Sequence, residues 1–188
     1  MGVEVEIKAH VDAPEGVIAR LEEIGSFRRR YIKEDRYFGR SRDPKRSRFR
    51  LRRDGERWVC TYKQKTLVDR VEQNREVEFD VSDGDAFTSL AEELGFFVAV
   101  EKRKEGSEWT VDGIIVEVSN VFSLGHFVEL ELILQDESDP EELAAARRRL
   151  FALLERIGIP ASRIETRPYT QMIYENRTIT GQTAGASL

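Results

Sequence analysis

The sequence contains little of what several classes of site and scaffold require. It has one cysteine, Cys60, and only two histidines among 188 residues. A single cysteine excludes an intramolecular disulfide framework and fits a reducing cytoplasm, where we expect the protein to lie. Two histidines and one cysteine cannot build a zinc site of the usual kind. Any metal would therefore be held by carboxylates, which indicates Mg²⁺ or Mn²⁺.

Long apolar runs are also absent. No stretch approaches the length of a membrane span, and the N-terminus lacks the basic and apolar regions of a signal peptide, so no membrane partner is expected. The chain is 40% hydrophobic and 35% charged, which is typical of a soluble globular protein. Its length fits one domain with a substantial core. We predict that this domain covers residues 1–176 and that the small, polar tail at 177–188 is disordered.

The formal net charge of −5 conceals an uneven distribution. From Arg28 to Arg57 the chain carries fourteen Lys or Arg against five Asp or Glu. Such a basic stretch in an acidic protein indicates an anionic ligand, with nucleic acid among the candidates.

Helical periodicity is clear in three stretches, 14–24, 85–94 and 140–157. The first and the third follow an aspartate that can cap a helix N-terminus, Asp12 and Asp139. A glycine suited to a helix end follows each of the three. We therefore predict three helices.

Nearly all the remaining segments alternate apolar and polar residues with the period of a strand. The Asp54-Gly55 and Asp112-Gly113 pairs predict tight hairpin turns. No internal repeat and no interdomain linker interrupts this pattern. The predicted strands are 3–9, 31–38, 47–53, 57–65, 74–81, 98–104, 107–111, 114–119 and 127–134.

One face of these strands is aliphatic and the other is charged. In the first strand Glu4, Glu6 and Lys8 share one side, because alternate side chains of a strand point the same way. The two carboxylates stand roughly 7 Å apart, so their repulsion costs about 2 kcal/mol at an effective dielectric of about 20. Cations gather on the third, fourth and sixth strands, and carboxylates on the fifth and ninth. Such a face is either the wetted side of an antiparallel sheet, with cross-strand ion pairs, or the lining of a barrel.

The charge pattern favours the barrel. Eight or nine antiparallel strands tend to curl and close, which removes free strand edges. A charged interior must be hydrated or filled by a matching ligand. A polyphosphate with divalent cations matches, because Arg and Lys bind phosphate oxygens while paired carboxylates bind the metal. We therefore predict an α+β fold: a closed antiparallel β-barrel of about eight strands that forms a tunnel, with helices packed outside.

A series of short motifs, in order along residues 3 to about 174, resembles the CYTH superfamily, the triphosphate tunnel metalloenzymes. The strongest is LGHFVELE, similar to the family's Leu-Gly-x-Phe-x-Glu-x-Glu. The last motif is similar to the ending of the branch that contains class IV adenylyl cyclases. The motifs are EVEIK (4–8), DRYF (35–38), FRLR (49–52), TYKQK (61–65), REVEF (75–79), EKRK (101–104), LGHFVELE (124–131) and RPYTQMI (167–173).

The resemblance implies a closed tunnel, Mg²⁺ or Mn²⁺ as cofactor and a substrate that bears a triphosphate. It implies that six glutamates hold or adjoin the metal: Glu4, Glu6, Glu129, Glu131, Glu76 and Glu78. It implies phosphate binding by six cations: Lys8, Arg50, Arg52, Lys63, Lys102 and Lys104. Five further residues are expected in the lumen: Arg48, Lys65, Asp35, Tyr37 and Glu117.

Three positions depart from the family's pattern. Ser119 stands where many relatives have an aspartate, which bears on metal binding. The inward cation of the sixth strand is Lys104 where relatives often have arginine, although a register slip of one residue would place Arg103 there. Arg-Pro, in place of Arg-Ser, precedes Tyr169. Tyr169 itself either contacts the substrate or clasps the C-terminal segment.

Several functions remain open at this point. Our first choice is cyclisation of ATP to cyclic AMP and pyrophosphate; the alternative enzyme is a triphosphatase that hydrolyses inorganic or thiamine triphosphate. A non-catalytic polyphosphate binder would need the same cations without productive metal geometry. An RNA-binding module would use Arg28 to Arg57, but only Tyr31, Tyr37 and Phe49 could stack bases, so nucleic acid is not the expected partner. A homodimer is an assembly to be tested.

Overall fold

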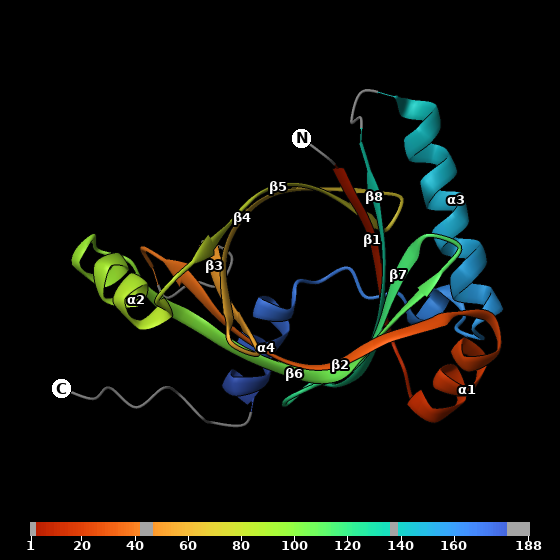
Figure 1. The fold of residues 1–188 in the computed structure, drawn as a ribbon, viewed down its shortest axis with the longest axis horizontal. Helices are drawn as coiled ribbons and strands as arrows, with labels where there is room; N and C mark the ends of the chain where they lie inside the picture. Colours follow the sequence, from red (N-terminus) through yellow and green to blue (C-terminus); the bar gives the residue numbers. More distant parts are fainter. Residues whose placement is uncertain (1–2, 42–46, 136–138, 180–188) are drawn as a thin grey trace.

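The computed structural model describes residues 3–41, 47–135 and 139–179. Eight antiparallel strands form a closed barrel, and four α-helices lie outside it (Figure 1). This is the predicted fold class. The strands are β1 (Val3–His10), β2 (Ser26–Gly39), β3 (Ser47–Asp54), β4 (Arg57–Val68), β5 (Val71–Val81), β6 (Phe97–Val111), β7 (Ile114–Val121) and β8 (Gly125–Leu134).

The strand order around the barrel is β1-β5-β4-β3-β2-β6-β7-β8, and β8 pairs again with β1. The predicted strands 98–104 and 107–111 are one strand, β6, so eight strands form where nine segments alternate. Gly106 lies at the join and pairs with Tyr31 on β2 and Ser119 on β7. A Cβ at Gly106 would lie 2.2 Å from the Val118 carbonyl oxygen, so this close approach of two strands requires glycine.

The three predicted helices are present as α1 (Pro14–Ile24), α2 (Gly84–Glu93) and α3 (Pro140–Arg156). Asp139 caps α3, as predicted, by accepting hydrogen bonds from the backbone N–H groups of Glu141 and Glu142. The predicted cap of α1 is wrong: Ala13 occupies the N-cap position, and the Asp12 carboxylate instead pairs with Arg163. Asp12 therefore lies one residue before the N-cap position, and no side chain caps α1.

A fourth helix, α4 (Tyr169–Ile179), follows a short 3₁₀ turn at Ala161–Arg163 and was not predicted. The boundary placed after residue 176 therefore falls inside a helix, and residues 180–188 of the expected tail lie outside the described residues. None of the helices in the described ranges is both long and apolar enough to cross a membrane.

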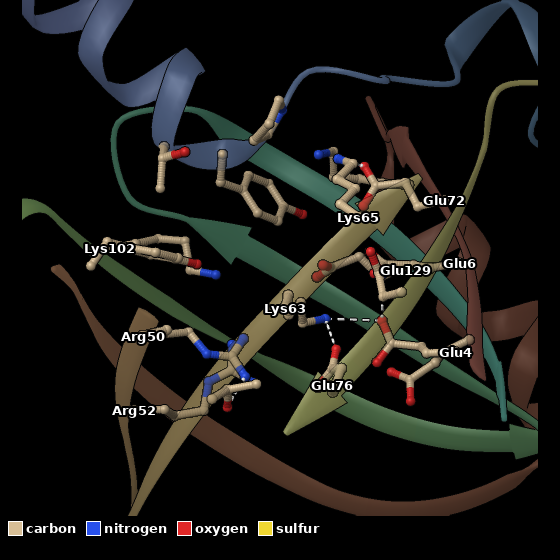
Figure 2. A pocket seen from close by; sticks show the side chains of 18 of the residues that line it. Glu4, Glu6, Arg50, Arg52, Lys63, Lys65, Glu72, Glu76, Lys102 and Glu129 are labelled. Carbon is tan, nitrogen blue, oxygen red and sulfur yellow. Dashed lines mark hydrogen bonds and ion pairs between the residues drawn. The ribbon is translucent and has the colours of Figure 1, made fainter. Parts of the chain in front are cut away.

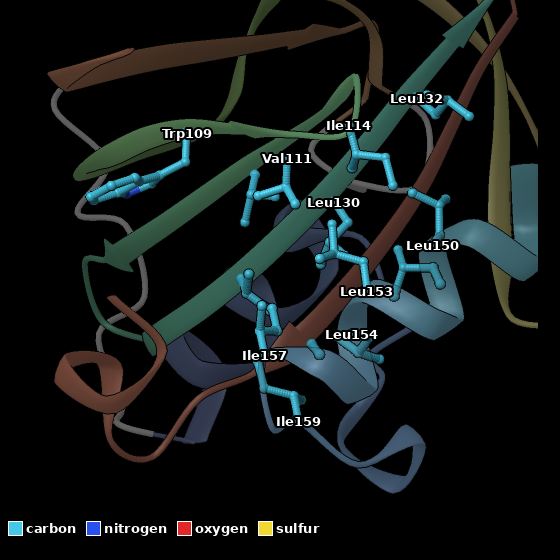
Figure 3. Packing of buried hydrophobic residues seen from close by; sticks show 14 of the residues in the cluster. Trp109, Val111, Ile114, Leu130, Leu132, Leu150, Leu153, Leu154, Ile157 and Ile159 are labelled. Carbon is cyan, nitrogen blue, oxygen red and sulfur yellow. The ribbon is translucent and has the colours of Figure 1, made fainter. Parts of the chain in front are cut away.

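The main hydrophobic core lies between the outer face of the barrel and helices α1 and α3 (Figure 3). Leu130 on β8 and Leu150 and Leu154 on α3 are almost fully buried there. Because alternate residues of β1 and β8 fill this core, the intervening residues of the same strands must point into the barrel. The packing of α3 thus fixes which side chains of β1 and β8 line the tunnel.

A second cluster packs α2 against β2, β3 and β4, with Phe38, Leu51 and Cys60 buried. The helices do not cover the whole outer surface, however. On the outer side of β4 and β5, Tyr62, Val77 and Phe79 are exposed among the described residues. Ile32 on β2 is exposed as well, so helices cover only part of the outer surface.

Candidate functional site

The inward faces of the strands enclose a cavity of about 720 Å³, the tunnel. Nine Lys or Arg and eight Glu line it among the described residues, so its charges nearly balance and it is strongly polar. All the residues predicted for the lumen except Asp35 line it. They are Glu4, Glu6, Lys8, Tyr37, Arg48, Arg50, Arg52, Lys63, Lys65, Glu76, Glu78, Lys102, Lys104, Glu117, Glu129 and Glu131.

The sign of the charge divides the tunnel into two walls. The consecutive strands β4, β3, β2 and β6 supply all lining cations but Lys8, and we call them the cationic wall. The consecutive strands β5, β1, β8 and β7 supply all eight lining glutamates and form the carboxylate wall. Figure 2 shows Arg50, Arg52 and Lys102 on one side, Glu4, Glu6 and Glu129 on the other, and Lys63 between them. Closure of the sheet thus turns strand-by-strand segregation of charge into two facing surfaces.

Asp35 lies behind the cationic wall. Its side chain is fully buried, its two oxygens accept hydrogen bonds from Arg52 Nε and Nη2 at 2.7 and 3.0 Å, and Lys102 Nζ lies 2.7 Å from Oδ2. Burial opposes ionisation of Asp35, but Arg52 and Lys102 outweigh it and hold the pKa of the carboxyl well below its usual range. Asp35 is therefore an orienting carboxylate that a ligand in the tunnel does not touch.

Lys63 joins the two walls. Its Nζ lies 3.0 Å from Glu4 Oε1 and also pairs with Glu76. Burial disfavours the charged lysine, but Glu4, Glu6 and Glu76 outweigh burial and raise the pKa of Lys63. Next to it on the cationic wall, Arg50 donates from Nη2 to Thr61 Oγ1 at 2.9 Å, while its buried Nε has no hydrogen-bond partner among the described residues.

Glu6 and Glu131 are buried glutamates of the carboxylate wall that both have a raised pKa. They are direct partners across the β1–β8 ladder. Burial, and then the charges of Glu4 and Glu129, raise the pKa of Glu6 to about 7. Burial, and then Glu4 and Glu6, raise the pKa of Glu131 to about 8. Like charges placed this close in a buried site favour uptake of a proton or of a cation.

Lys104 is already neutralised by the carboxylate wall. Its Nζ donates to Glu117 at 2.5 Å and to Glu129 at 2.6 Å, and Lys33 pairs with Glu117 from the other side. Burial opposes ionisation of Glu129, but Lys104 lowers the pKa of Glu129 to about 2. Lys104 therefore has less positive charge to offer a phosphate than Arg50 or Lys102.

On β6 it is Lys104, and not Arg103, that faces the tunnel. Lys104 lines the tunnel, whereas Arg103 is exposed on the outer surface and lies 3.8 Å from Glu34. Ser119 is buried outside the tunnel lining, and its Oγ makes no hydrogen bond to the described residues. Glu117 is therefore the β7 carboxylate of the tunnel, two residues before Ser119.

The residues fit a hard divalent cation in donor type and charge. Within the described ranges, no three Asp, Glu, His or Cys side chains are already arranged as a metal site. Glu6 and Glu131 nevertheless face one another with Glu4 nearby, and burial, followed by the charges of neighbouring glutamates, raises the pKa of both; a bound divalent cation would offset these costs. Carboxylate oxygens are the ligands that Mg²⁺ and Mn²⁺ prefer.

Sequence reasoning missed several lining residues. Lys33, Glu72 and Asn74 line the tunnel, and Asn74 Nδ2 donates to Glu4 Oε1 at 3.0 Å. Lys33 has the same parity as Asp35 and Tyr37 on β2, and Glu72 the same parity as Glu76 on β5. The alternation of the strands therefore indicates these positions, but no motif includes them. The predicted fifth strand starts at residue 74, whereas β5 starts at Val71, so Glu72 falls outside the prediction.

The family model described as CYTH domain matches residues 2–169. A protein from Methanocaldococcus jannaschii named "putative adenylate cyclase" is 26% identical over 175 residues, which cover 90% of this chain and 98% of that protein. A solved structure from Pyrococcus horikoshii is 25% identical, has a TM-score of 0.78 and matches 93% of this chain and 99% of its own.

A more distant structure comes from Hippeastrum. It is 16% identical, has a TM-score of 0.64 and matches 96% of each chain. Its name describes an adenylyl cyclase candidate that reveals a dominant triphosphatase activity. At this identity the likeness shows a shared fold alone.

Proposed function

Because the chain belongs to the CYTH domain family, we propose that it is a metal-dependent enzyme that acts on a triphosphate chain bound in the tunnel. The observation that carries the proposal is the cationic wall facing the carboxylate wall across one cavity. A phosphate chain alone would need only cations. Paired carboxylates on the opposite wall are explained if a divalent cation is bound with the substrate.

The roles divide between the walls. Arg50, Arg52, Lys63 and Lys102 bind phosphate oxygens, with the arginines suited to bidentate contact and the lysines acting as point charges. Glu4, Glu6, Glu129 and Glu131 would hold Mg²⁺ or Mn²⁺, with Glu76 and Glu78 nearby. When bound, the ion supplies neutralisation of phosphate charge during transfer. The rest of catalysis consists of positioning and charge stabilisation by these fixed side chains.

ATP cyclisation is the first proposed reaction. The ribose 3′-oxygen forms a bond to the α-phosphorus, the bond from that phosphorus to the bridging oxygen breaks, and pyrophosphate leaves. The hydroxyl proton passes to solvent or to a carboxylate. The motifs at 124–131 and 167–173 and the name of the Methanocaldococcus jannaschii relative support this assignment. We place the reaction in the cytoplasm, because a chain with one cysteine has no intramolecular disulfide framework.

Hydrolysis of a triphosphate is the second proposed reaction, and one observation favours it. The lining aromatic residues are Tyr37, Phe49 and Tyr169; Phe49 is stacked on Phe38, and Tyr169 packs edge-on against Phe127 with Lys8 over its ring, so both of these rings are already engaged by other side chains. A substrate without a base, such as inorganic triphosphate, needs no aromatic clamp. Water would then attack the γ-phosphorus, and the terminal phosphate would leave the chain.

Product analysis separates the two reactions. The protein is incubated at neutral to alkaline pH with ATP, inorganic triphosphate or thiamine triphosphate, each with Mg²⁺ or Mn²⁺. Cyclic AMP with pyrophosphate supports the cyclase, whereas ADP or phosphate without cyclic AMP supports the triphosphatase. A protein that leaves all three compounds unchanged with either metal is not the proposed enzyme.

A further inference from the structure

Two isoleucines lie among the charged residues of the tunnel. Ile115 on β7 and Ile133 on β8 are the only aliphatic residues among the described strand positions that line the cavity. Their neighbours Ile114 and Leu132 are buried in the main hydrophobic core, but neither isoleucine belongs to a hydrophobic cluster of the described residues. Ile133 is 61% exposed. The fold therefore leaves apolar surface uncovered inside a charged cavity.

The two side chains lie at the same mouth of the tunnel. Because β7 and β8 are antiparallel, Ile115 near the start of β7 and Ile133 near the end of β8 fall at the same end of the pair. Ile115 pairs with Glu131, so Ile133 is its diagonal neighbour, within reach of a long side chain. Phe127, at the opposite end of β8, packs against Tyr169 of α4. We call Ile115 and Ile133 the apolar lip, and it lies at the mouth away from α4.

The apolar lip adjoins glutamates of the carboxylate wall. Ile115 is the direct partner of Glu131 across the β7–β8 ladder, and Ile133 is the direct partner of Glu4 across the β1–β8 ladder. Direct partners in an antiparallel pair have Cβ atoms roughly 4.5–5.5 Å apart. In Figure 2, Glu4 lies across the pocket from the blue ribbon of the C-terminal segment. Apolar surface thus alternates at this mouth with the carboxylates proposed to hold the metal.

A phosphate chain cannot cover the apolar lip, because it has no apolar surface of its own. The organic group of a substrate can, since the contact removes apolar surface of both partners from water. The rings of Phe49 and Tyr169 are packed against other aromatic rings and are not free to hold such a group. A nucleobase with its ribose has apolar faces that can lie over two isoleucine side chains. The lip therefore favours a substrate that carries a nucleoside.

We propose that Ile115 and Ile133 hold the nucleoside of a nucleoside triphosphate at the mouth away from α4. This inference rests on the proposed function and deepens it by giving the direction in which the substrate lies. A chain that starts at the lip places its α-phosphate, rather than its γ-phosphate, next to Glu4 and Glu131. The α-phosphorus is the atom attacked in cyclisation, so this direction matches the first proposed reaction. Hydrolysis of a triphosphate without a base makes no use of the lip.

The test measures two affinities in each full-length variant. The ligands are analogues of ATP and of tripolyphosphate in which methylene groups replace the bridging oxygens, so that neither chain is cleaved. Isothermal titration calorimetry in the presence of Mg²⁺ gives both dissociation constants, and thermal unfolding without ligand reports on the fold. The variants are Ile115→Ala and Ile133→Ala. Ile32→Ala is the matched control, because Ile32 is a half-exposed strand residue outside the tunnel lining.

We expect each lip variant to raise the dissociation constant of the ATP analogue about tenfold, the loss for about two buried methylene groups. The dissociation constant of the tripolyphosphate analogue should not change, because the phosphate chain does not touch the lip. Ile133→Val keeps most of the apolar surface and should keep most of the affinity, and Ile32→Ala should change neither constant. If Ile115→Ala lowers the unfolding midpoint, Ile133→Ala decides alone, because Ile133 is the more exposed of the two.

Each of three results overturns the inference alone. Equal rises for both analogues would show that the isoleucines shape the tunnel and hold no organic group, and unchanged constants for both would place the nucleoside elsewhere. A wild-type chain that binds the tripolyphosphate analogue but not the ATP analogue also defeats the inference, and it leaves the proposed function standing as hydrolysis of a triphosphate without a base. If the wild type binds neither analogue, the proposed function itself fails, and the inference fails with it.

Discussion

Adjacent arginines on β3 have opposite surroundings. Arg52 lies in the tunnel against Asp35, whereas Arg53 is exposed, donates to the Gly55 carbonyl at 3.1 Å and lies over Trp58. Parity alone predicted this difference, because neighbouring residues of a strand point to opposite faces. The same rule located most of the lumen, since the charged position of each motif recurs every second residue.

The arginine pair gives a test of phosphate binding. Replacing Arg50, Arg52 or Lys63 by alanine should weaken the binding of tripolyphosphate by roughly 1.5–3 kcal/mol each, the range for a hydrogen bond to a charged group. Arg53→Ala should do little. Isothermal titration calorimetry measures the four affinities. A loss in Arg53→Ala as large as that in Arg52→Ala would contradict the assignment of these cations to the substrate.

Removing the charge of buried Asp35 should lower the free energy of unfolding more than removing that of an exposed aspartate that also pairs with an arginine. Asp35→Asn leaves Arg52 and Lys102 buried without their countercharge, so we expect a loss of about 3–5 kcal/mol in the free energy of unfolding. Urea unfolding measures it. Asp80→Asn is the control, because Asp80 is exposed and paired with exposed Arg57, and its change should stay within about 0.5 kcal/mol.

Tripolyphosphate should recover more stability in Asp35→Asn than in the wild type, since its phosphates replace the missing negative charge beside Arg52. Equal unfolding free energies for Asp35→Asn and Asp80→Asn would show that the buried carboxylate does not hold the cationic wall.

At the scale of elements, regular strands and capped helices could be predicted, and elements made by tertiary contacts could not. Helix α3 carries both its signals in sequence, Asp139 before it and an apolar period within it. Helix α4 carries neither: its sequence, YTQMIYENRTI, mixes polar and β-branched residues. Its position comes from Tyr169 and Met172 packing on Phe127, contacts between segments more than forty residues apart. No local pattern reports such contacts.

The sequence predicts two strands where the structure has the single strand β6, and the reason is local. Glu105 and Gly106 lie between the two predicted strands, 98–104 and 107–111, so the sequence alone indicates a break there. In the barrel the strand continues, because Gly106 lets β7 approach closely. A glycine therefore marks a contact here rather than a turn.

This contact can be tested with two glycine variants. Gly106→Ala would bring a Cβ against the Val118 carbonyl, and we expect it to lower the free energy of unfolding by about 1–3 kcal/mol or more. Gly16→Ala, in α1, meets nothing within 4 Å and should raise it by about 0.5–1 kcal/mol. Chemical denaturation measures both. Equal changes in the two variants would rule out a close approach of β6 and β7.

At the scale of the whole molecule, the carboxylate wall should make stability depend on pH without metal. The pKa values of Glu6 and Glu131 are about 7 and about 8 in the folded state, against 4.5 ordinarily. Between these values the folded chain binds more protons than the unfolded chain, so the free energy of unfolding should fall as pH rises from about 5 to 8. Carboxyls with lowered pKa, such as Glu129, add stability that is lost as pH falls from about 4.5 to about 2, below this window.

Thermal unfolding in the presence of a chelator measures the effect. The double variant Glu6→Gln, Glu131→Gln should flatten the pH profile, keep its fold and lose metal-dependent turnover. Adding Mg²⁺ should restore stability at pH 8 in the wild type but not in the variant. A midpoint that rises between pH 5 and 8 in the wild type would show that these two carboxylates do not repel as described.

Closure of the barrel also restricts how the gene for this chain can change in length. One codon inserted within β1 would exchange the tunnel-facing and core-facing residues beyond it, and β1 is paired with both β5 and β8. A strand of a closed barrel absorbs an extra residue only as a local bulge, and β2 already has register shifts between Phe27 and Arg29 and between Tyr37 and Phe38. We therefore expect insertions and deletions at such bulges and at connections such as Asp54 to Arg57, whereas single substitutions inside the tunnel leave the strand register intact. In evolution, the charges of the tunnel lining can therefore change more readily than the number and register of the strands that set its width.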